Sequence, residues 1–513
     1  MSSAKPVEPR PIEPLSGAML IFATLTIGLA SFMAVVDITI ANVSVPTISG
    51  NLGVSSEEGE WVITSFAIAN AIFIPLTGWL SQRFGQVRLF VTAVALFTLA
   101  SMLCGMARSF ESLLFFRVLQ GAVSGPIVPL SQALLVAIFP PHKRTLAVAM
   151  WAMTNMTGPV AGPLLGGWIT DQYSWPWIFL VNVPVGIFVV ASTYMLMRNR
   201  ETATRKRPVD VIGLVLLAIT MSTLQITLDR GRTLDWLASP FIAVCAAVAV
   251  LGLIGLVVWE LDEEHPVIDL RLFSHRNFAA GTVAVAIGFG LYFAALVLIP
   301  LWLQTNMSYS STWAGLVTAP LGVFGICLAP FMGRWVHKYD PRWFASVAFI
   351  AWAIVAYWRA SMTTDVDAVT IALGCLAQGI GIGFFLTPLV SLSLAGLPSD
   401  KLPSATGLQT AIRMMSGSLI ASLAQTFWDQ RARFHQTHLV EKLTAMNDGT
   451  NQAVSSLQGM GLSHEQAWAG IAQKLDIQAH MLSLNDFFYL SMWLFMAALA
   501  LVWFARSPHA SNQ

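Results

Sequence analysis

Charged side chains are scarce in this chain of 513 residues. Asp, Glu, Lys and Arg together make up 11% of it, against about 25% in an ordinary soluble domain. Hydrophobic residues make up 56%, and the mean hydropathy is +0.67. Too few polar side chains remain to cover a water-facing surface, which excludes a soluble globular protein and indicates a polytopic membrane protein. The net charge of +1 gives no sign of nucleic-acid binding.

Motifs for catalysis and cofactor binding are also missing. The sequence contains no phosphate-binding Gly-Lys-Ser loop, no nucleophile elbow and no cluster of metal ligands. We therefore expect no enzymatic activity, no cofactor and no metal, and transport would need an ion gradient or the membrane potential. The four cysteines lie in apolar segments without metal or disulfide spacing, as small packing residues do.

Long apolar segments fill most of the chain. They lie near 17–41, 61–80, 88–107, 112–137, 145–169, 175–197, 211–228, 239–259, 278–302, 313–335, 343–361, 368–396, 404–426 and 484–505. At about 20 residues each, they predict an all-α membrane protein with about fourteen transmembrane helices. An even number places both termini on one side. The loops of that side are rich in Lys and Arg, so we expect both termini to be cytoplasmic.

An internal repeat divides the chain. Pro75-Leu76-Thr77-Gly78 recurs as Pro330-Phe331-Met332-Gly333, and Gln120-Gly121 recurs as Gln378-Gly379, at an offset near 255. Duplicated halves of this kind are typical of alternating-access transporters. We expect a cytoplasmic tail (1–16), a six-helix bundle (17–200), two inserted helices with linkers (201–276), a second six-helix bundle (277–505) and a short cytoplasmic tail (506–513).

Glycine and proline are concentrated in one apolar segment, from Gly158 to Gly167. At helical spacing, Gly158, Gly162 and Gly166 form a smooth strip, and Pro159 and Pro163 bend the helix. Such a helix is tolerated in a bilayer when a neighbour packs closely against it. The strip is either a tight helix contact with no further role or the surface on which two halves of a transporter close. If the second holds, the facing helix belongs to the other half.

A few polar residues lie at membrane depth, where an ionised side chain costs about 2.5–3.5 kcal/mol on insertion scales. Asp37 lies well inside the first span, and burial favours its neutral form, as suits a group that binds and releases protons. Arg117 could bias that protonation, and a purely structural ion pair is the alternative. The predicted proton-coupling residues are Asp37 and Arg117, and the predicted substrate-pathway residues are Asn42, Gln120, Asn155, Gln225 and Arg413. The amides among them are more often contacts between helices than ligands of a substrate.

One polar loop is long, from 427 to 483. Within it Ser463 and Gln466 predict a capped helix start, and Trp468, Ile471 and Leu475 share one face of that helix. The loop is either a solvated hairpin or a docking element for a periplasmic partner.

Several of these motifs resemble the major facilitator superfamily. Residues 78–88 are similar to its signature loop, through Gly78, Arg83, Gly85 and Arg88, with Gln82 where the family often has Asp. Residues 117–121 resemble a fourth-span motif linked with proton coupling. The fifth-span motif of drug and proton antiporters resembles Gly158, Pro159, Gly162, Pro163, Gly166 and Gly167. Segments 37–46 and 175–184 are similar to the fourteen-span branch of this superfamily, and within it to the EmrB type.

The resemblance implies a function and partners. It implies a multidrug exporter of the bacterial inner membrane, driven by proton entry, whose substrates are hydrophobic drugs. It further implies a periplasmic adaptor of the EmrA type and an outer-membrane channel, which together form a tripartite pump. A proton-coupled uptake symporter of the same fold and a channel or membrane scaffold without transport activity are the alternatives.

Overall fold

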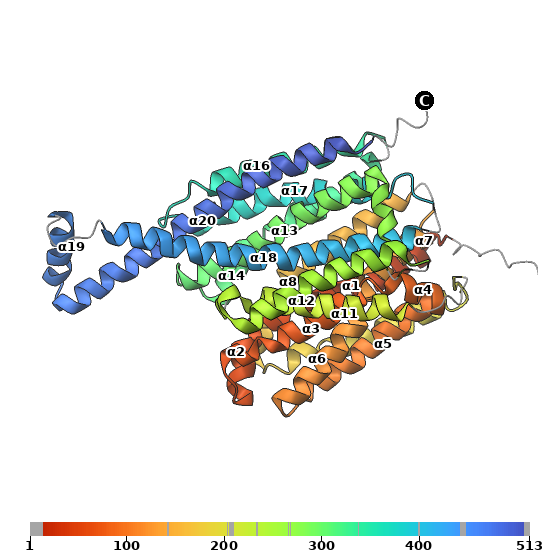
Figure 1. Ribbon diagram of the computed structural model, residues 1–513, viewed down its shortest axis with the longest axis horizontal. Coiled ribbons are helices and arrows are strands. Elements are labelled where there is room, and N and C mark those ends of the chain that lie inside the picture. Colours follow the sequence, from red (N-terminus) through yellow and green to blue (C-terminus); the bar gives the residue numbers. More distant parts are fainter. Residues whose placement is uncertain are drawn as a thin grey trace, which may run out of the picture.

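A computed structural model describes residues 14–506 apart from 141–142, 203, 205–209, 232–233, 265, 267, 337, 399–400 and 442–447. The chain is helical over these residues, and no β-strand occurs among them. Figure 1 shows long helices that run side by side in one elongated bundle. The expected all-α architecture is confirmed.

The first half of the chain builds one group of helices. They are α1 (Gly17–Leu52), α2 (Ser56–Gly59), α3 (Trp61–Phe73), α4 (Thr77–Phe84), α5 (Gln86–Gly105), α6 (Phe110–Ser124), α7 (Ile127–Ile138), α8 (Arg144–Gln172), α9 (Trp177–Leu180) and α10 (Asn182–Met197). α3 and α4 are bent by 59° relative to each other. Pro75 lies in this break, and proline breaks a helix because it has no N–H to donate and crowds the preceding turn. Pro126, between α6 and α7, interrupts a second apolar segment in the same way.

Two helices follow that belong to neither half. They are α11 (Val211–Gly231) and α12 (Pro240–Asp262), with short 3₁₀ turns at Trp236–Ala238 and Leu270–Ser274. α11 packs against α12, α3 and α18. α12 is peripheral, since only 22% of its most apolar window is buried and Leu251 and Val258 are exposed. An exposed helix this apolar fits a lipid environment rather than water.

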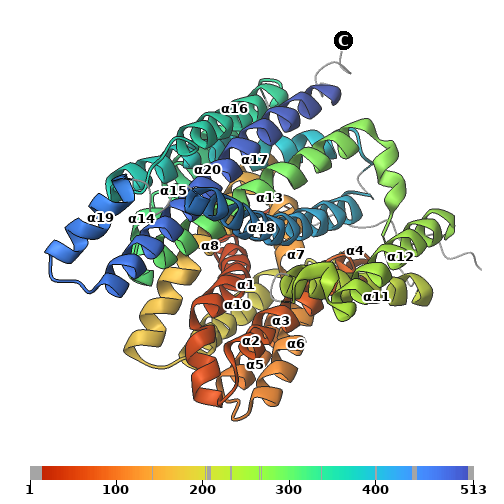
Figure 2. The ribbon, with the colours of Figure 1, turned by 60° about the vertical axis from the view of Figure 1, so that its left-hand side comes forward.

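The second half builds the other group of helices. They are α13 (Arg276–Thr305), α14 (Ser311–Thr318), α15 (Leu321–Trp335), α16 (Pro341–Arg359), α17 (Ala368–Leu394), α18 (Leu402–Glu441), α19 (Asp448–Gly459) and α20 (His464–Phe504). Figure 2 shows this group beside the first, with α11 and α12 at one flank. α8 joins the two groups, because it packs against α1 on one side and against α14 and α15 on the other.

The two ends of the bundle differ. The described residues of 427–441 and 448–483 form a projecting hairpin, made of the far part of α18, α19 and the near part of α20, which extends well beyond the other helices in Figure 1. We call this the hairpin end. The start of α1 and the end of α20 lie at the opposite, terminal end. The segment predicted as a loop is thus largely helical, and the expected capping box between Ser463 and Gln466 begins α20.

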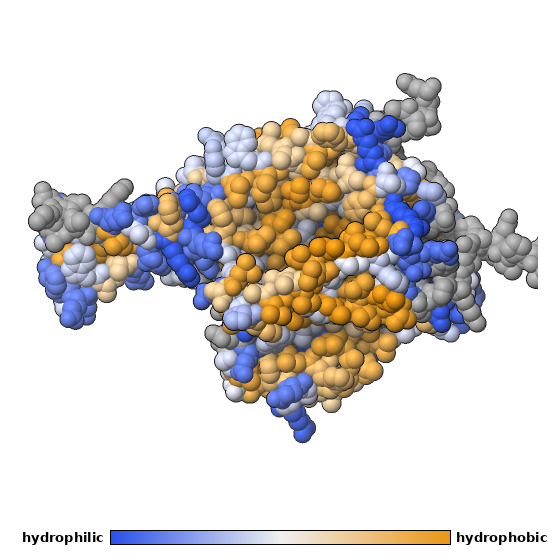
Figure 3. All heavy atoms as spheres, in the orientation of Figure 1, coloured by the Kyte–Doolittle hydropathy of each residue, from blue (hydrophilic) through white to orange (hydrophobic). Residues whose placement is uncertain are grey.

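The surface carries an apolar band. Figure 3 shows hydrophobic side chains over the middle of the bundle and hydrophilic ones at both ends and over the projecting hairpin. Nine helices or helix pairs in the described ranges are long and apolar enough to span a bilayer, and the bent pair α3–α4 makes a tenth. The sequence predicts about fourteen. The difference lies in α8, α14–α15, α16 and α18, which are shorter or more polar.

Candidate functional site

A charge pair lies at the core of the first half. Nη1 of Arg117, on α6, stands 2.7 Å from Oδ2 of Asp37, on α1, and neither side chain has any exposed surface. The two residues predicted to be involved in proton coupling are therefore in direct contact. A buried pair of this kind is tolerated only when its remaining polar atoms are also satisfied.

Neutral donors and acceptors complete the pair. Gln120 Nε2 and Asn182 Nδ2 donate to Oδ1 of Asp37 at 2.9 and 2.8 Å. Arg117 donates through Nε to the Val62 carbonyl oxygen at 2.9 Å and through Nη1 to Oε1 of Gln120 at 2.9 Å. Its Nη2 has no hydrogen-bond partner in the parts of the chain that are described. Both charged groups are therefore hydrogen-bonded on several sides, and Nη2 of Arg117 is the donor without a partner in the described part of the chain.

Asn182 is a member of this network that the sequence analysis missed. It begins α10 directly after the short helix α9, and it also hydrogen-bonds Ser101 Oγ at 3.0 Å. One indication of its importance was present in the sequence, because Asn182 lies in segment 175–184, the segment similar to the fourteen-span branch. Asn182 stands two positions before Pro184 and opens α10 after a run rich in aromatic residues.

The second half lacks the corresponding acid. The offset of 258 that relates Gln120 to Gln378 relates Arg117 to Cys375, and an offset of 255 relates Asp37 to Tyr292. Here a buried arginine comes from α16 instead: Arg359 Nη1 donates to Gln378 Oε1 at 2.7 Å. No salt bridge to Arg359 occurs within the described ranges. Among the described residues, a buried acid–base pair of this kind therefore occurs in the first half and has no counterpart at these positions of the second.

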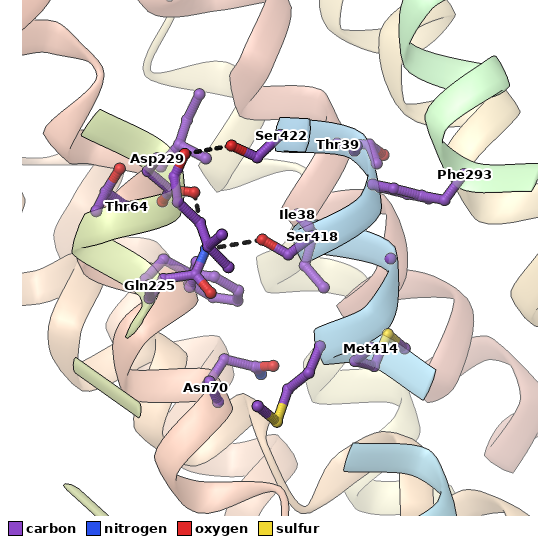
Figure 4. A pocket seen from close by; sticks show the side chains of 18 of the residues that line it. Ile38, Thr39, Thr64, Asn70, Gln225, Asp229, Phe293, Met414, Ser418 and Ser422 are labelled. Carbon is purple, nitrogen blue, oxygen red and sulfur yellow. Dashed lines mark hydrogen bonds between the residues drawn. The ribbon is translucent and has the colours of Figure 1, made fainter. Parts of the chain in front are cut away.

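A central cavity lies between the halves. Its volume is about 380 Å³, and its walls come from α1, α3, α11, α13 and α18, with Asn155 of α8. Figure 4 shows Thr64, Asn70, Gln225 and Ser418 directed into it. Most of the remaining wall is apolar, including Phe293 and Met414. A large, mostly apolar space with a few convergent polar groups is the usual form of a binding site for hydrophobic small molecules.

The cavity and the charge pair share one turn of α1. Val35, Ile38 and Thr39 line the cavity, whereas Asp37 is fully buried and is not part of its wall. The Asp37 carboxylate therefore points away from the cavity while its neighbours in the chain face it. A movement of this turn would therefore change both the cavity wall and the Asp37–Arg117 pair.

Arg413 lines the cavity from α18 with little exposed surface. Its guanidinium lies 5.1 Å from the ring centroid of Trp151, in the first half, and 5.3 Å from that of Phe289, in the second. Its Nε and Nη2 have no hydrogen-bond partner among the residues described. Arg413 is thus a buried cation held between aromatic rings of the two halves.

The other predicted pathway residues are placed as follows. Asn155 lines the cavity and hydrogen-bonds Ser31 and the Trp151 carbonyl oxygen. Gln225 lines it from α11. Gln120 belongs to the charge pair instead. The side chains of Asn42, Pro159 and Pro163 lie outside the described part of the structure.

The glycine strip packs within its own half. A Cβ on Gly158 would lie 2.6 Å from Cγ1 of Val35, and one on Gly166 would lie 2.7 Å from the Ile40 carbonyl oxygen. Both neighbours belong to α1, so the expectation of a facing helix from the other half is wrong. α8 meets the other half through a different face, where Leu164 approaches Gly315. The strip therefore presses on the turns of α1 that carry Asp37.

The signature loop lies at the terminal end, where the halves meet. A Cβ on Gly78 would lie 3.4 Å from the Ser404 Cα of α18. Gly85 has φ +91°, which favours glycine. The carboxylate of Glu201 accepts the backbone N–H groups of Val87 and Arg88 at 3.1 and 2.8 Å. Glu201 is a residue that sequence reasoning overlooked.

Arg83 and Arg88 differ in their surroundings. The guanidinium of Arg83 lies 5.5 Å from the Trp79 ring centroid, whereas Arg88 Nε stands 3.9 Å from Glu201. Arg88 is largely exposed, so this pair contributes little to stability. The Arg88–Glu201 ion pair thus adds little to the backbone hydrogen bonds that Glu201 accepts in this loop.

Comparison with known proteins gives a consistent result. Residues 27–422 match the model of the Major Facilitator Superfamily. The chain is 44% identical over 501 residues to the "Multidrug export protein EmrB" of Escherichia coli strain K12, which covers 98% of each chain. It is 45% identical over 500 residues to the protein of the same name from Haemophilus influenzae, covering 97% of this chain and 98% of that one.

A solved structure shares the fold. The proton:xylose symporter XylE, bound to 6-bromo-6-deoxy-D-glucose, superposes with a TM-score of 0.57 at 12% identity and covers 95% of each chain. At this identity the likeness concerns the arrangement of helices and not the substrate.

Proposed function

The chain belongs to the major facilitator superfamily, and from that premise we propose that it is a proton-driven antiporter that exports hydrophobic drugs across the bacterial inner membrane. The observation that carries the proposal is the Asp37–Arg117 pair on the same turn of α1 that lines the drug-sized cavity. Relatives named for multidrug export, similar over almost their full length, support the direction and the substrate class.

The proposed topology has fourteen spans. Added to the ten apolar spans, the segments α8, α14–α15, α16 and the first part of α18 make fourteen. These four line the interior of the bundle or carry polar residues there, which lowers their mean hydropathy. With fourteen spans both termini lie on one side, and the excess of Lys and Arg in the loops at the terminal end supports the cytoplasm as that side.

Proton coupling follows from the charge pair. When Asp37 takes up a proton, Arg117 loses its counter-ion but keeps its bonds to the Val62 carbonyl and Gln120. The attraction that holds α1 to α6 then weakens, and the turn that holds Ile38 and Thr39 can shift against the cavity. A buried pair is suited to this, because its interaction changes by several kcal/mol with one proton.

Drug and proton would thus act on the same helical turn from opposite sides. The glycine strip of α8 provides a smooth surface on which α1 can move. At the terminal end the halves touch through Gly78 and Ser404, while at the hairpin end the cavity reaches Glu60, whose side chain is 39% exposed. This arrangement corresponds to an outward-facing state, in which drug would leave and a proton would enter.

The test is transport in inverted membrane vesicles. An antiporter accumulates drug in the vesicle lumen and releases lumenal protons, whereas an uptake symporter of the same fold moves both in one direction, and a channel ignores a collapsed gradient. Asp37→Asn should keep drug binding and abolish proton-driven accumulation, because the isosteric amide cannot exchange a proton. An exposed acid on α8 provides the matched control, Asp171→Asn, which should transport normally. Full activity of Asp37→Asn would refute the proton-coupling role.

We also propose the partners. The projecting hairpin extends from the hairpin end, which is periplasmic in this topology. At its base, Arg431 Nη2 stands 2.6 Å from Oδ2 of Asp486, and Trp428 Nε1 donates to the His480 carbonyl oxygen at 2.9 Å. A helical projection of this size suits the docking of a periplasmic adaptor of the EmrA type, which in turn would contact an outer-membrane channel. Co-purification with the adaptor tests this.

A further inference from the structure

Asp229 lies near the end of α11, the first inserted helix, and lines the central cavity. Gln225 Nε2 donates to its Oδ1 at 2.9 Å and lies 3.0 Å from Oγ of Ser418 on α18. The hydroxyl of Thr64, on α3, also hydrogen-bonds the carboxylate. Figure 4 shows these side chains together. The inserted helix therefore brings an acid to the place where it meets both halves.

The charged groups around Asp229 leave it without a cation of its own. Arg230 is paired with Glu60, with Nη1 3.0 Å from Oε2, and its guanidinium stands 5.8 Å from the Trp61 ring centroid. Arg413, which lines the cavity from α18, lies between two aromatic rings. No salt bridge joins Asp229 to a basic side chain in the ranges that the structure describes. Its hydrogen-bond donors are neutral, and the nearby positive charge of Arg230 is shared with Glu60.

The surroundings of the carboxylate are those of a site for an amphiphilic molecule. Leu228, Phe293 and Met414 line the same cavity, and the rings of Phe289 and Phe293 stack with their centroids 5.9 Å apart. A carboxylate beside apolar and aromatic walls attracts a cation more strongly than it does in water, because the local dielectric constant is lower. Aromatic faces add to this attraction.

We propose that Asp229 binds the charged group of lipophilic organic cations in the central cavity. The assignment rests on the proposed drug export and adds to it a substrate class and a residue. It also gives the inserted helices a role, since among the described lining residues Asp229 is the acid that has no salt bridge to an arginine. Glu60, the other acid, is already neutralised by Arg230.

Binding there would affect how the halves are joined. The Gln225 amide links Asp229 to Ser418, and so links α11 to α18. A cation at the carboxylate competes with that amide for the oxygen atoms. A cation bound at Asp229 would therefore weaken the Gln225 hydrogen bonds that join α11 to α18 of the second half.

The test uses two ions of the same shape and opposite charge, tetraphenylphosphonium and tetraphenylborate. Their binding to the full-length protein in lipid nanodiscs is measured by calorimetry, with empty nanodiscs subtracted. Asp229→Asn is nearly isosteric and keeps an oxygen that can accept from Gln225. Asp229→Glu keeps the charge, and Asp171→Asn removes an exposed acid from another helix. Unfolding temperatures of all variants establish that they are folded.

We expect Asp229→Asn to bind tetraphenylphosphonium about tenfold more weakly, or worse, and to bind tetraphenylborate as well as the wild type or better. Asp229→Glu and Asp171→Asn should bind both ions nearly as the wild type does. Equal affinity of the wild type and Asp229→Asn for the cation would overturn the assignment, as would an equal loss for both ions. If vesicles show no proton-driven export while this charge selectivity persists, the proposed function fails and the binding site stands.

Discussion

The interaction between Asp37 and Arg117 can be measured through stability. Asp37→Asn retains an oxygen for the Gln120 and Asn182 amides but leaves Arg117 buried without a counter-ion. Removing one member of a buried ion pair costs about 3–5 kcal/mol. Arg117→Gln leaves the Asp37 carboxylate with neutral donors only and should cost a similar amount. Changing both residues removes both charges, so the double variant should lose less than the sum of the two single variants.

The expected shift in unfolding temperature follows from size. One kcal/mol moves the midpoint by about 2–4 °C in chains of 150–250 residues, and the shift falls as the chain lengthens. At about 1–2 °C per kcal/mol for a chain this long, each single variant should unfold roughly 3–10 °C lower. The double variant should recover at least half of the summed loss.

The assay is thermal unfolding in one detergent and at one pH, followed by intrinsic fluorescence, with Asp171→Asn as the exposed control. Because a membrane protein of this size need not unfold in two states, the comparison rests on the order of the midpoints and not on absolute free energies. A wild-type midpoint for Asp37→Asn, or strict additivity in the double variant, would show that the pair is not the source of the coupling.

Three further predictions follow from the same geometry. Gly166→Leu should fold but export poorly, because its Cβ would lie 2.7 Å from the Ile40 carbonyl oxygen and would push α1 away; normal export in vesicles would contradict this. Arg413→Met should unfold at the wild-type temperature or higher, since two of its nitrogens have no partner, yet lower drug export; a fall in unfolding temperature with export intact would show that it is structural. Changing both Trp468 and Ile471 to Ser should reduce recovery of the adaptor and leave vesicle antiport intact, and undiminished recovery would favour a solvated hairpin.

Some features were accessible from the sequence because they depend on local composition. The scarcity of charge and the repeated apolar segments required a helical membrane protein. Asp37 and Arg117 were recognisable because charge at membrane depth is costly wherever the helix packs. The Ser463 capping box was also local, since it involves residues three positions apart.

Other features depended on which helices meet, and a single sequence does not state this. The glycine strip was correctly read as a close contact, but only the packed structure placed it against α1 of its own half. Asn182 joined the charge pair from 145 positions away. Asp229 lay just past the apolar segment 211–228, and nothing local distinguished it from a residue at a helix end. Its importance arises from α3 and α18, which bring Thr64 and Ser418 to it.

The physical reason for this division is the range of the forces involved. Hydropathy, helix capping and the cost of burying a charge act on a residue through its immediate neighbours, so the sequence alone determined an all-α membrane protein with an acid and a base that both needed partners. The identity of those partners, the cavity between the halves and the side of α8 that touches α1 depend on contacts between segments far apart in the chain. Only the tertiary structure decided them, because close packing selects one arrangement among many that the same hydrophobic pattern allows.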